Sequence, residues 1–153
     1  MSKPNFVYVS YIASTPEKVF KALTDTEATA RFWFGNAVES DWKVGSPVTF
    51  RRNGELVVTG KVLEFEPPRR LSYTFHAQKD GLYTEQPSRV LIEIEQQKAQ
   101  VKLTMTHDDF PVGSKTLERV SNGWPLVLSS LKSYLEADRV LTAPWYDQEN
   151  AAA

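Results

Sequence analysis

The stretch that decides the fold runs from Lys115 to about Arg139 and reads KTLERVSNGWPLVLSSLKSYLEADR. Its large apolar residues recur at spacings of three and four: Trp124, Leu128, Leu131 and Leu135. This period predicts a long helix with one apolar face, which needs another element to cover it. Because Pro125 cannot donate a backbone hydrogen bond, the helix is expected to break or kink near Gly123.

The middle of the chain has the two-residue period of β-strands and predicts the partner of that helix. Apolar residues alternate with polar ones in four runs: Val48 and Phe50; Leu71, Tyr73 and Phe75; Val90, Ile92 and Ile94; Val101, Leu103 and Met105. Asn53-Gly54 is a strong signal for a tight hairpin, and Pro67-Pro68 stops the long return strand from Leu56 to Phe65. The pattern predicts a meander of antiparallel strands with one apolar face.

One further strand and two short helices are expected before the meander. Phe6 to Ile12 is rich in β-branched and aromatic residues, which favour a strand. Ser14 to Glu17 supplies a hydroxyl cap, a proline and an acid, the features of a helix start. Thr24-Asp25 is placed to cap a second short helix that Gly35 ends.

Composition excludes several classes of function. The 153 residues include 18 Lys and Arg against 19 Asp and Glu, and this balance argues against a general nucleic-acid binder. The absence of cysteine excludes disulfides, thiolate nucleophiles and cysteine-ligated metals. The longest unbroken apolar run is Phe6 to Val9, too short for membrane insertion, and no apolar signal region follows Met1 to Asn5. We expect a cytoplasmic location.

Local motifs occur in the order typical of one superfamily. They are Ser14 to Thr24, Trp33-Phe34, Val44-Gly45, Val62 to Pro68 with Leu71, Leu103 to His107, and Gly123-Trp124 with the leucines that follow. The chain therefore resembles the START-like (SRPBCC) superfamily, and the motifs are similar to its branch named for the activator of the Hsp90 ATPase, the AHSA1-like family. The resemblance covers about residues 6–140.

The resemblance implies a fold and a place for a ligand. It implies one START-like domain over residues 1–153, with an α+β helix-grip fold in which a curved antiparallel sheet of about six strands wraps a long C-terminal helix. In that family, a cavity between sheet and helix commonly holds an apolar ligand. The eukaryotic activator stimulates the ATPase through a separate N-terminal domain, for which we expect no room in this chain.

The apolar sides of the predicted strands and helix supply the candidate ligand-binding residues. They are Trp33, Phe34, Phe50, Tyr73, Phe75, Val90, Ile92, Leu103, Met105, His107, Trp124, Leu128 and Leu131. Plain core is the alternative for most of them, while the number of large aromatics under a single helix favours a pocket. Trp33 is expected at the pocket mouth or in packing over the sheet edge, and Trp42 in surface packing.

Histidine chemistry is the remaining candidate. By alternation His107 shares the face of Leu103 and Met105, where a neutral imidazole would bond a ligand or act as a base; the alternative is a cap on the strand end. His76 is expected on the opposite, solvent-exposed face, so the two histidines predict no metal site. No catalytic constellation and no cofactor are predicted.

Three functions are compatible with these features. The first is a non-catalytic protein that binds an apolar or amphipathic small molecule, such as a lipid. The second is an enzyme of the polyketide cyclase or hydrolase type, with His107 as the acid or base and Tyr73 as a hydrogen-bond donor. The third, suggested by the family name alone, is a stress-response protein that contacts a chaperone.

Overall fold

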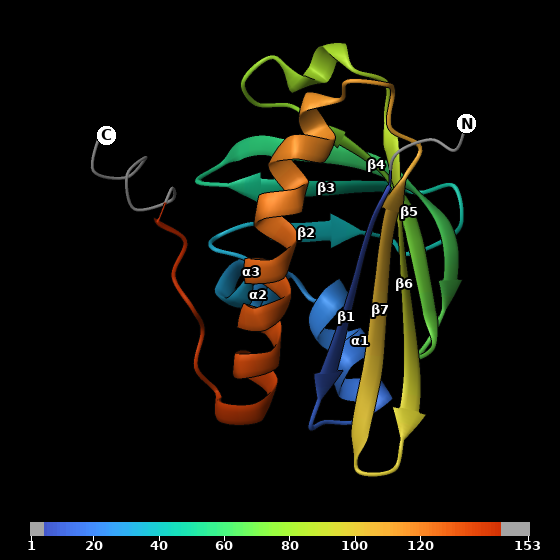
Figure 1. Ribbon diagram of the computed structural model, residues 1–153, viewed down its shortest axis with the longest axis vertical. Coiled ribbons are helices and arrows are strands. Elements are labelled where there is room, and N and C mark those ends of the chain that lie inside the picture. Colours follow the sequence, from blue (N-terminus) through green and yellow to red (C-terminus); the bar gives the residue numbers. More distant parts are fainter. Residues whose placement is uncertain (1–4, 145–153) are drawn as a thin grey trace.

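The computed structural model describes residues 5–144 (Figure 1). The strands are β1 (Phe6–Ile12), β2 (Ala37–Ser40), β3 (Pro47–Arg52), β4 (Glu55–Glu66), β5 (Arg70–Ala77), β6 (Ser88–Gln97) and β7 (Gln100–Asp108). The helices are α1 (Pro16–Thr24), α2 (Thr26–Phe32), the short 3-10 helix η1 (Leu82–Thr84) and α3 (Lys115–Ala137). This is the α+β helix-grip arrangement that the sequence predicts.

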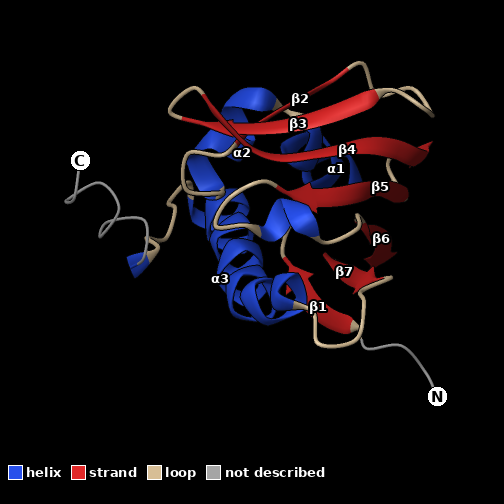
Figure 2. Ribbon diagram, turned by 90° about the horizontal axis from the view of Figure 1, so that it is seen from above, coloured by secondary structure: helices blue, strands red, loops and turns tan. Residues whose placement is uncertain are grey.

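All seven strands of this part of the chain form one antiparallel sheet in the order β1-β7-β6-β5-β4-β3-β2. Strands that follow one another along the chain are neighbours, except that β1 lies beside β7. The sheet bends strongly, and α3 lies across its open side (Figure 2). The concave face therefore faces the apolar side of the long helix.

The two short helices begin where their caps predict. The Thr15 side chain accepts a hydrogen bond from the backbone N–H of Lys18, and Pro16 takes the first position of α1. The carboxylate of Asp25 accepts one from the N–H of Ala28 at 2.9 Å and so caps α2. α2 ends at Phe32, and a turn leads from there to the next strand.

The sheet has one strand more than the sequence predicts. Asn53 and Gly54 have φ angles of 53° and 79°, the left-handed values that a tight hairpin needs, so this predicted turn is confirmed. The extra strand is β2, which pairs with β3. In this pairing Ala37 lies opposite Arg51 and Ser40 lies opposite Val48. Four residues, of which only Val38 is buried, are too few to display a two-residue period.

The predicted break in the long helix is wrong. α3 runs from Lys115 to Ala137 with Pro125 inside it. Continuing the helix through the proline keeps Val120, Trp124 and Leu128 on the buried side of the same element. Burial of these side chains offsets the one backbone hydrogen bond that Pro125 cannot make.

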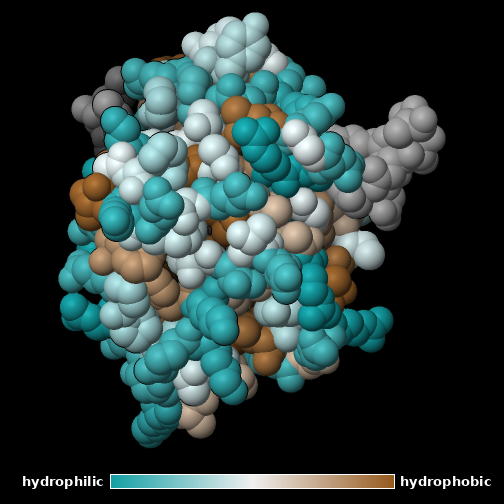
Figure 3. All heavy atoms as spheres, turned by 180° about the vertical axis from the view of Figure 1, so that it is seen from behind, coloured by the Kyte–Doolittle hydropathy of each residue, from teal (hydrophilic) through white to brown (hydrophobic). Residues whose placement is uncertain are grey.

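The core lies between the sheet and the helices as one continuous cluster. Its largest fully buried apolar side chains come from every layer: Ile12, Phe32, Phe50, Leu71, Ile92, Leu103, Met105, Phe110, Leu128 and Leu131. The face opposite α3 is mainly hydrophilic, with apolar atoms in small separate areas (Figure 3). In residues 5–144, no helix is both long and apolar enough to span a membrane.

Candidate functional site

A cavity of about 950 Å³ lies between the sheet and the N-terminal half of α3. Its walls come from β3, β4 and β5 on one side and from α3 residues Lys115 to Val127 on the other. The turn after α2 and the segment from Lys79 to Leu82 complete it. The volume lies in the range of small-molecule sites.

Four aromatic side chains form a connected inner wall. The ring centroid of Trp33 lies 4.8 Å from that of Phe50 and 5.1 Å from that of Trp124. The rings of Phe75 and Trp124 are 6.4 Å apart. The rings meet at tilted angles of 58°, 54° and 48°, so each ring of the wall packs against at least one other.

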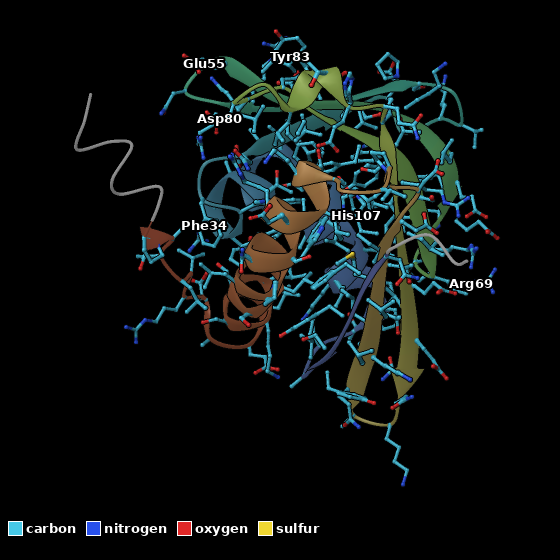
Figure 4. The ribbon with its side chains drawn as sticks, turned by 45° about the horizontal axis from the view of Figure 1, so that its top comes forward. Phe34, Glu55, Arg69, Asp80, Tyr83 and His107 are labelled. Atoms are coloured by element: carbon cyan, nitrogen blue, oxygen red, sulfur yellow. The ribbon has the colours of Figure 1, made fainter. Side chains whose placement is uncertain are left out.

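The rim of the cavity is charged, and ion pairs tie its parts together. Arg119 on α3 donates to Asp80 at 2.7 Å, which links the helix to the segment after β5. Lys79 pairs with Glu55 at the start of β4. Figure 4 shows Glu55, Asp80 and Tyr83 around this end of the molecule. An amphipathic molecule would therefore meet charge at the rim and aromatic rings inside.

Glu85 fastens the segment after η1 to the start of α3. One carboxylate oxygen accepts from the Ser114 hydroxyl at 2.6 Å, and the other accepts from the backbone N–H groups of Lys115 and Thr116. Partial burial alone would raise the pKa of Glu85, but these hydrogen bonds lower it overall. A carboxylate at a helix N-terminus is also favoured by the helix dipole.

The structure divides the sequence-predicted site residues into two groups. Five of them line the cavity: Trp33, Phe34, Phe50, Phe75 and Trp124. The other eight are buried in the core outside the cavity lining: Tyr73, Val90, Ile92, Leu103, Met105, His107, Leu128 and Leu131. Burial also raises the pKa of the Tyr73 phenol, which stays protonated. A ligand role stays a prediction for all thirteen residues, of which the first group lies in the wall of this cavity.

None of the polar lining residues was predicted from the sequence. The additional lining residues are Asn36, Arg52, Val57, Val58, Ala77, Lys79, Asp80, Leu82, Lys115, Thr116, Glu118, Arg119, Val120, Asn122, Gly123 and Val127. Val120 and Val127 had a usable signal, because they lie four residues before and three after Trp124 on the helix. The sequence gives no such signal for Asn36 and Asp80, because residues in turns follow no periodic pattern.

Both tryptophans before β3 are now placed. Trp33 lies in the cavity wall, 9% exposed, and a role at the pocket mouth stays a prediction. The half-buried Trp42 stacks on Phe65 with centroids 5.9 Å apart, and its indole N–H donates to the carbonyl of Thr24. Trp42 packs between the first helix and β4, as expected.

His107 lies deep behind α3 (Figure 4) and is fully engaged in a hydrogen-bonded chain. The indole N–H of Trp124 donates to Nδ1 of His107 at 2.9 Å. Nδ1 must therefore be an acceptor, and Nε2 carries the proton that it donates to Ser88 Oγ at 2.7 Å. The Ser88 hydroxyl donates in turn to the carbonyl of Phe75 at 3.1 Å.

This arrangement removes the support for His107 as an acid or base. Its imidazole is 0% exposed, packs 4.5 Å from the Phe110 ring and 4.8 Å from the Phe75 ring, and does not line the cavity. Burial lowers its pKa to about 3, partly offset by Asp108. His107 orients Trp124 from behind the cavity wall. The alternative, in which His107 caps the strand end, does not describe these contacts.

We expect the free energy of unfolding to fall as the pH drops below 6.5. The unfolded chain then binds a proton at His107 that the folded protein excludes until about pH 3, so the loss is about 1.4 kcal/mol per pH unit in that window and is absent above it. Urea denaturation should show about 2 kcal/mol less stability at pH 5 than at pH 7.5 from this residue. His107→Gln should remove that component; an unchanged pH dependence in the variant would contradict the assignment.

Within the described part of the chain, the remaining histidine and the acidic residues do not gather into a metal site. Nε2 of the half-buried His76 lies 2.9 Å from the carbonyl oxygen of Tyr83, on the opposite side of the sheet from His107. Within residues 5–144, no three His, Asp or Glu side chains cluster closely enough to hold a metal ion.

The fold and the cavity define the class of protein: a helix-grip protein whose long C-terminal helix closes a cavity against a curved sheet. Solved structures share this fold. The Aha1 dimer from Colwellia psychrerythraea has a TM-score of 0.73 at 23% identity and covers 88% of this chain and 97% of its own. A protein from Mesorhizobium loti has a TM-score of 0.75 at 24% identity, covering 87% of this chain and 97% of its own.

The family follows from the sequence match. Residues 13–136 match the family model described as "Activator of Hsp90 ATPase homolog 1-like protein", and the chain belongs to this family. An Hsp90 activator from Plasmodium falciparum is similar at 25% identity, with a TM-score of 0.65 and coverage of 78% of this chain and 86% of its own. No curated protein matches the sequence.

Proposed function

We propose that this protein is a non-catalytic binding protein that holds an apolar or amphipathic small molecule between its sheet and α3. The observation that carries the proposal is the cavity of about 950 Å³ with its wall of Trp33, Phe50, Phe75 and Trp124. Binding sites for small molecules are typically concave and apolar with a few polar groups, and this combination supports a ligand site.

The polar groups around the cavity favour an amphipathic occupant. The pairs of Arg119 with Asp80 and of Lys79 with Glu55 place charges of both signs at the rim. The one buried histidine is held behind the wall by Trp124 and Ser88. This arrangement favours a binding protein that catalyses no reaction. A cyclase or hydrolase would need His107 as its acid or base, and His107 does not line the cavity.

The proposed function is tested with the purified chain and one fluorescent apolar probe, 1-anilinonaphthalene-8-sulfonate. We expect saturable binding at one site and a rise in melting temperature with probe concentration, because a ligand of the native state stabilises it by mass action. Native mass spectrometry of the freshly purified protein should also show a co-purifying small molecule. Phe50→Ala should weaken probe binding at least tenfold, since Phe50 forms part of the wall.

The matched control removes an aromatic ring outside the cavity. Phe65→Ala deletes the same side chain from the packing between α1 and β4, where Phe65 contacts Phe20 and Trp42. This variant should lose stability and keep its affinity for the probe. Equal losses of affinity in both variants, or no saturable binding in the parent protein, would overturn the proposal.

Activation of a chaperone ATPase is the second candidate. The family membership and the Hsp90 activator from Plasmodium falciparum support it. Its test is the rate of ATP hydrolysis by purified Hsp90 with and without the chain. A rise in that rate that Phe50→Ala leaves unchanged would assign the activity to a surface other than the cavity.

A further inference from the structure

The charges that line the cavity are not balanced. Of the charged lining residues in the described chain, four are basic and two are acidic: Arg52, Lys79, Lys115 and Arg119 against Asp80 and Glu118. The whole protein carries 18 basic and 19 acidic residues, so the positive excess is local to the cavity. It remains when Glu55, which pairs with Lys79 from outside the lining, is added to the acids. A cleft with such an excess attracts negatively charged ligands.

Burial separates the charged rim from the aromatic wall. The four rings of the wall are each 9% exposed or less. The side chains of Arg119 and Asp80 are 55% and 64% exposed. A molecule in the cavity therefore meets apolar rings at its buried end and charged groups at its exposed end.

Arg119 is held at the rim by a contact that leaves most of its donors available. Its Nη1 donates to Oδ2 of Asp80 at 2.7 Å, which joins α3 to the segment after β5. A guanidinium has five N–H donors, and the described chain gives the Arg119 side chain no second hydrogen-bond partner. An oxyanion can accept from two N–H groups of one arginine, so Arg119 can hold Asp80 and a ligand anion together.

Lys115 adds a second positive charge one turn earlier on the same face of α3. Lys115 and Arg119 are four residues apart, a spacing at which like charges repel and slightly destabilise a helix. Asp80 offsets the charge of Arg119, whereas no carboxylate within residues 5–144 forms an ion pair with Lys115. Glu118, the acid on this face, pairs with neither of them. An anion at the rim would offset the repulsion.

We propose that the ligand is an anionic amphipathic molecule, with its apolar body against the aromatic wall and its oxyanion at the rim beside Arg119 and Lys115. This inference rests on the proposed function and names the ligand class of the same site. The rings hold the molecule, and the basic side chains orient it. Among ligands with the same apolar body, the site selects those that carry a negative charge.

Two fluorescent probes that differ by one charged group test the inference. 1-Anilinonaphthalene-8-sulfonate carries a sulfonate, and N-phenyl-1-naphthylamine is the same ring system without it. We expect Lys115→Gln to weaken binding of the sulfonate probe about threefold and to leave the neutral probe unchanged, because only the sulfonate meets the lost charge. Raising the NaCl concentration from about 0.05 M to about 0.5 M should likewise weaken binding of the sulfonate probe alone.

Arg119→Gln and Asp80→Asn separate the effect of charge from the effect of structure. Both variants break the same ion pair between α3 and the segment after β5, but they change the charge of the rim in opposite directions. Arg119→Gln should weaken binding of the sulfonate probe about fivefold, and Asp80→Asn should strengthen it about threefold. Changes of the same sign in the two variants, or equal changes for both probes, would contradict the inference.

The same titrations distinguish a free anion from an amphipathic one. Inorganic sulfate should displace no more of the sulfonate probe than NaCl does at equal ionic strength. Greater displacement by sulfate would mean that the rim binds a small free anion, and the inference would be wrong. Saturable binding of both probes with affinities that the charge variants leave unchanged would overturn the inference alone. If neither probe binds the parent protein saturably, the proposed function fails as well.

Discussion

Replacing Trp124 with alanine is expected to lower the free energy of unfolding by about 3–5 kcal/mol. The indole is 3% exposed, contacts Trp33 and Phe75, and donates the hydrogen bond that fixes His107. Its removal enlarges the cavity, withdraws a wall ring and leaves the buried Nδ1 of His107 without a donor. Denaturant unfolding measures the stability, and titration with an apolar probe measures the accompanying loss of affinity.

Trp124→Phe separates the ring from its hydrogen bond. Phenylalanine keeps an aromatic wall but leaves Nδ1 of His107 unpaired, so we expect a loss of about 1–3 kcal/mol. Probe affinity should fall less than in Trp124→Ala. If the alanine variant loses less than about 1 kcal/mol, Trp124 does not link the wall to the histidine in the way that the contacts imply.

Replacing Gly60 with alanine is expected to cost about 3 kcal/mol or more, and the variant is expected to fold poorly. A Cβ atom on Gly60 would lie 1.8 Å from the carbonyl oxygen of Thr74 on β5, far inside van der Waals contact. The Thr74 hydroxyl also accepts from the N–H of Lys61, so neither strand can shift freely. Denaturant unfolding or, for an insoluble variant, the soluble yield measures the effect.

Gly123 supplies the matched control. A Cβ atom there meets no atom within 4 Å beyond its chain neighbours and the backbone of its own helix, and the residue lies inside α3. Gly123→Ala should therefore stabilise the protein by about 0.5–1 kcal/mol, because alanine loses less conformational entropy in a helix than glycine. Similar changes in both variants would show that the close approach of β4 to β5 is not what requires Gly60.

Along its length, α3 first lines the cavity and then packs into the core. In its N-terminal half, Val120, Trp124 and Val127 face the cavity. Just beyond, Leu128 and Leu131 are 0% exposed and pack into the core. Trp124 of the aromatic wall lies one helical turn before the buried Leu128, so core packing supports the wall of the cavity.

Short-range features were predictable because each depends on neighbouring residues. Asp25 caps α2 through a hydrogen bond within three residues, and Asn53-Gly54 turns the chain by its own φ angles. Leu103 and Met105 alternate with polar residues along β7, and this local pattern correctly predicted that both lie on its buried face. The helix does not break near Gly123, where a break or kink was predicted, because burial across the whole of α3 outweighs one missing hydrogen bond.

The sequence by itself determined the order of the elements other than β2 and η1, the buried faces and the family, since periodicity, caps and turn residues act locally. Tertiary structure alone decided which buried residues are core and which line the cavity. It also engaged both nitrogens of His107 with Trp124 and Ser88, residues 17 and 19 positions away. It left Oδ1 of Asn36 buried without a donor. Contacts between distant segments depend on how the sheet curves around α3, and no local pattern encodes that curvature.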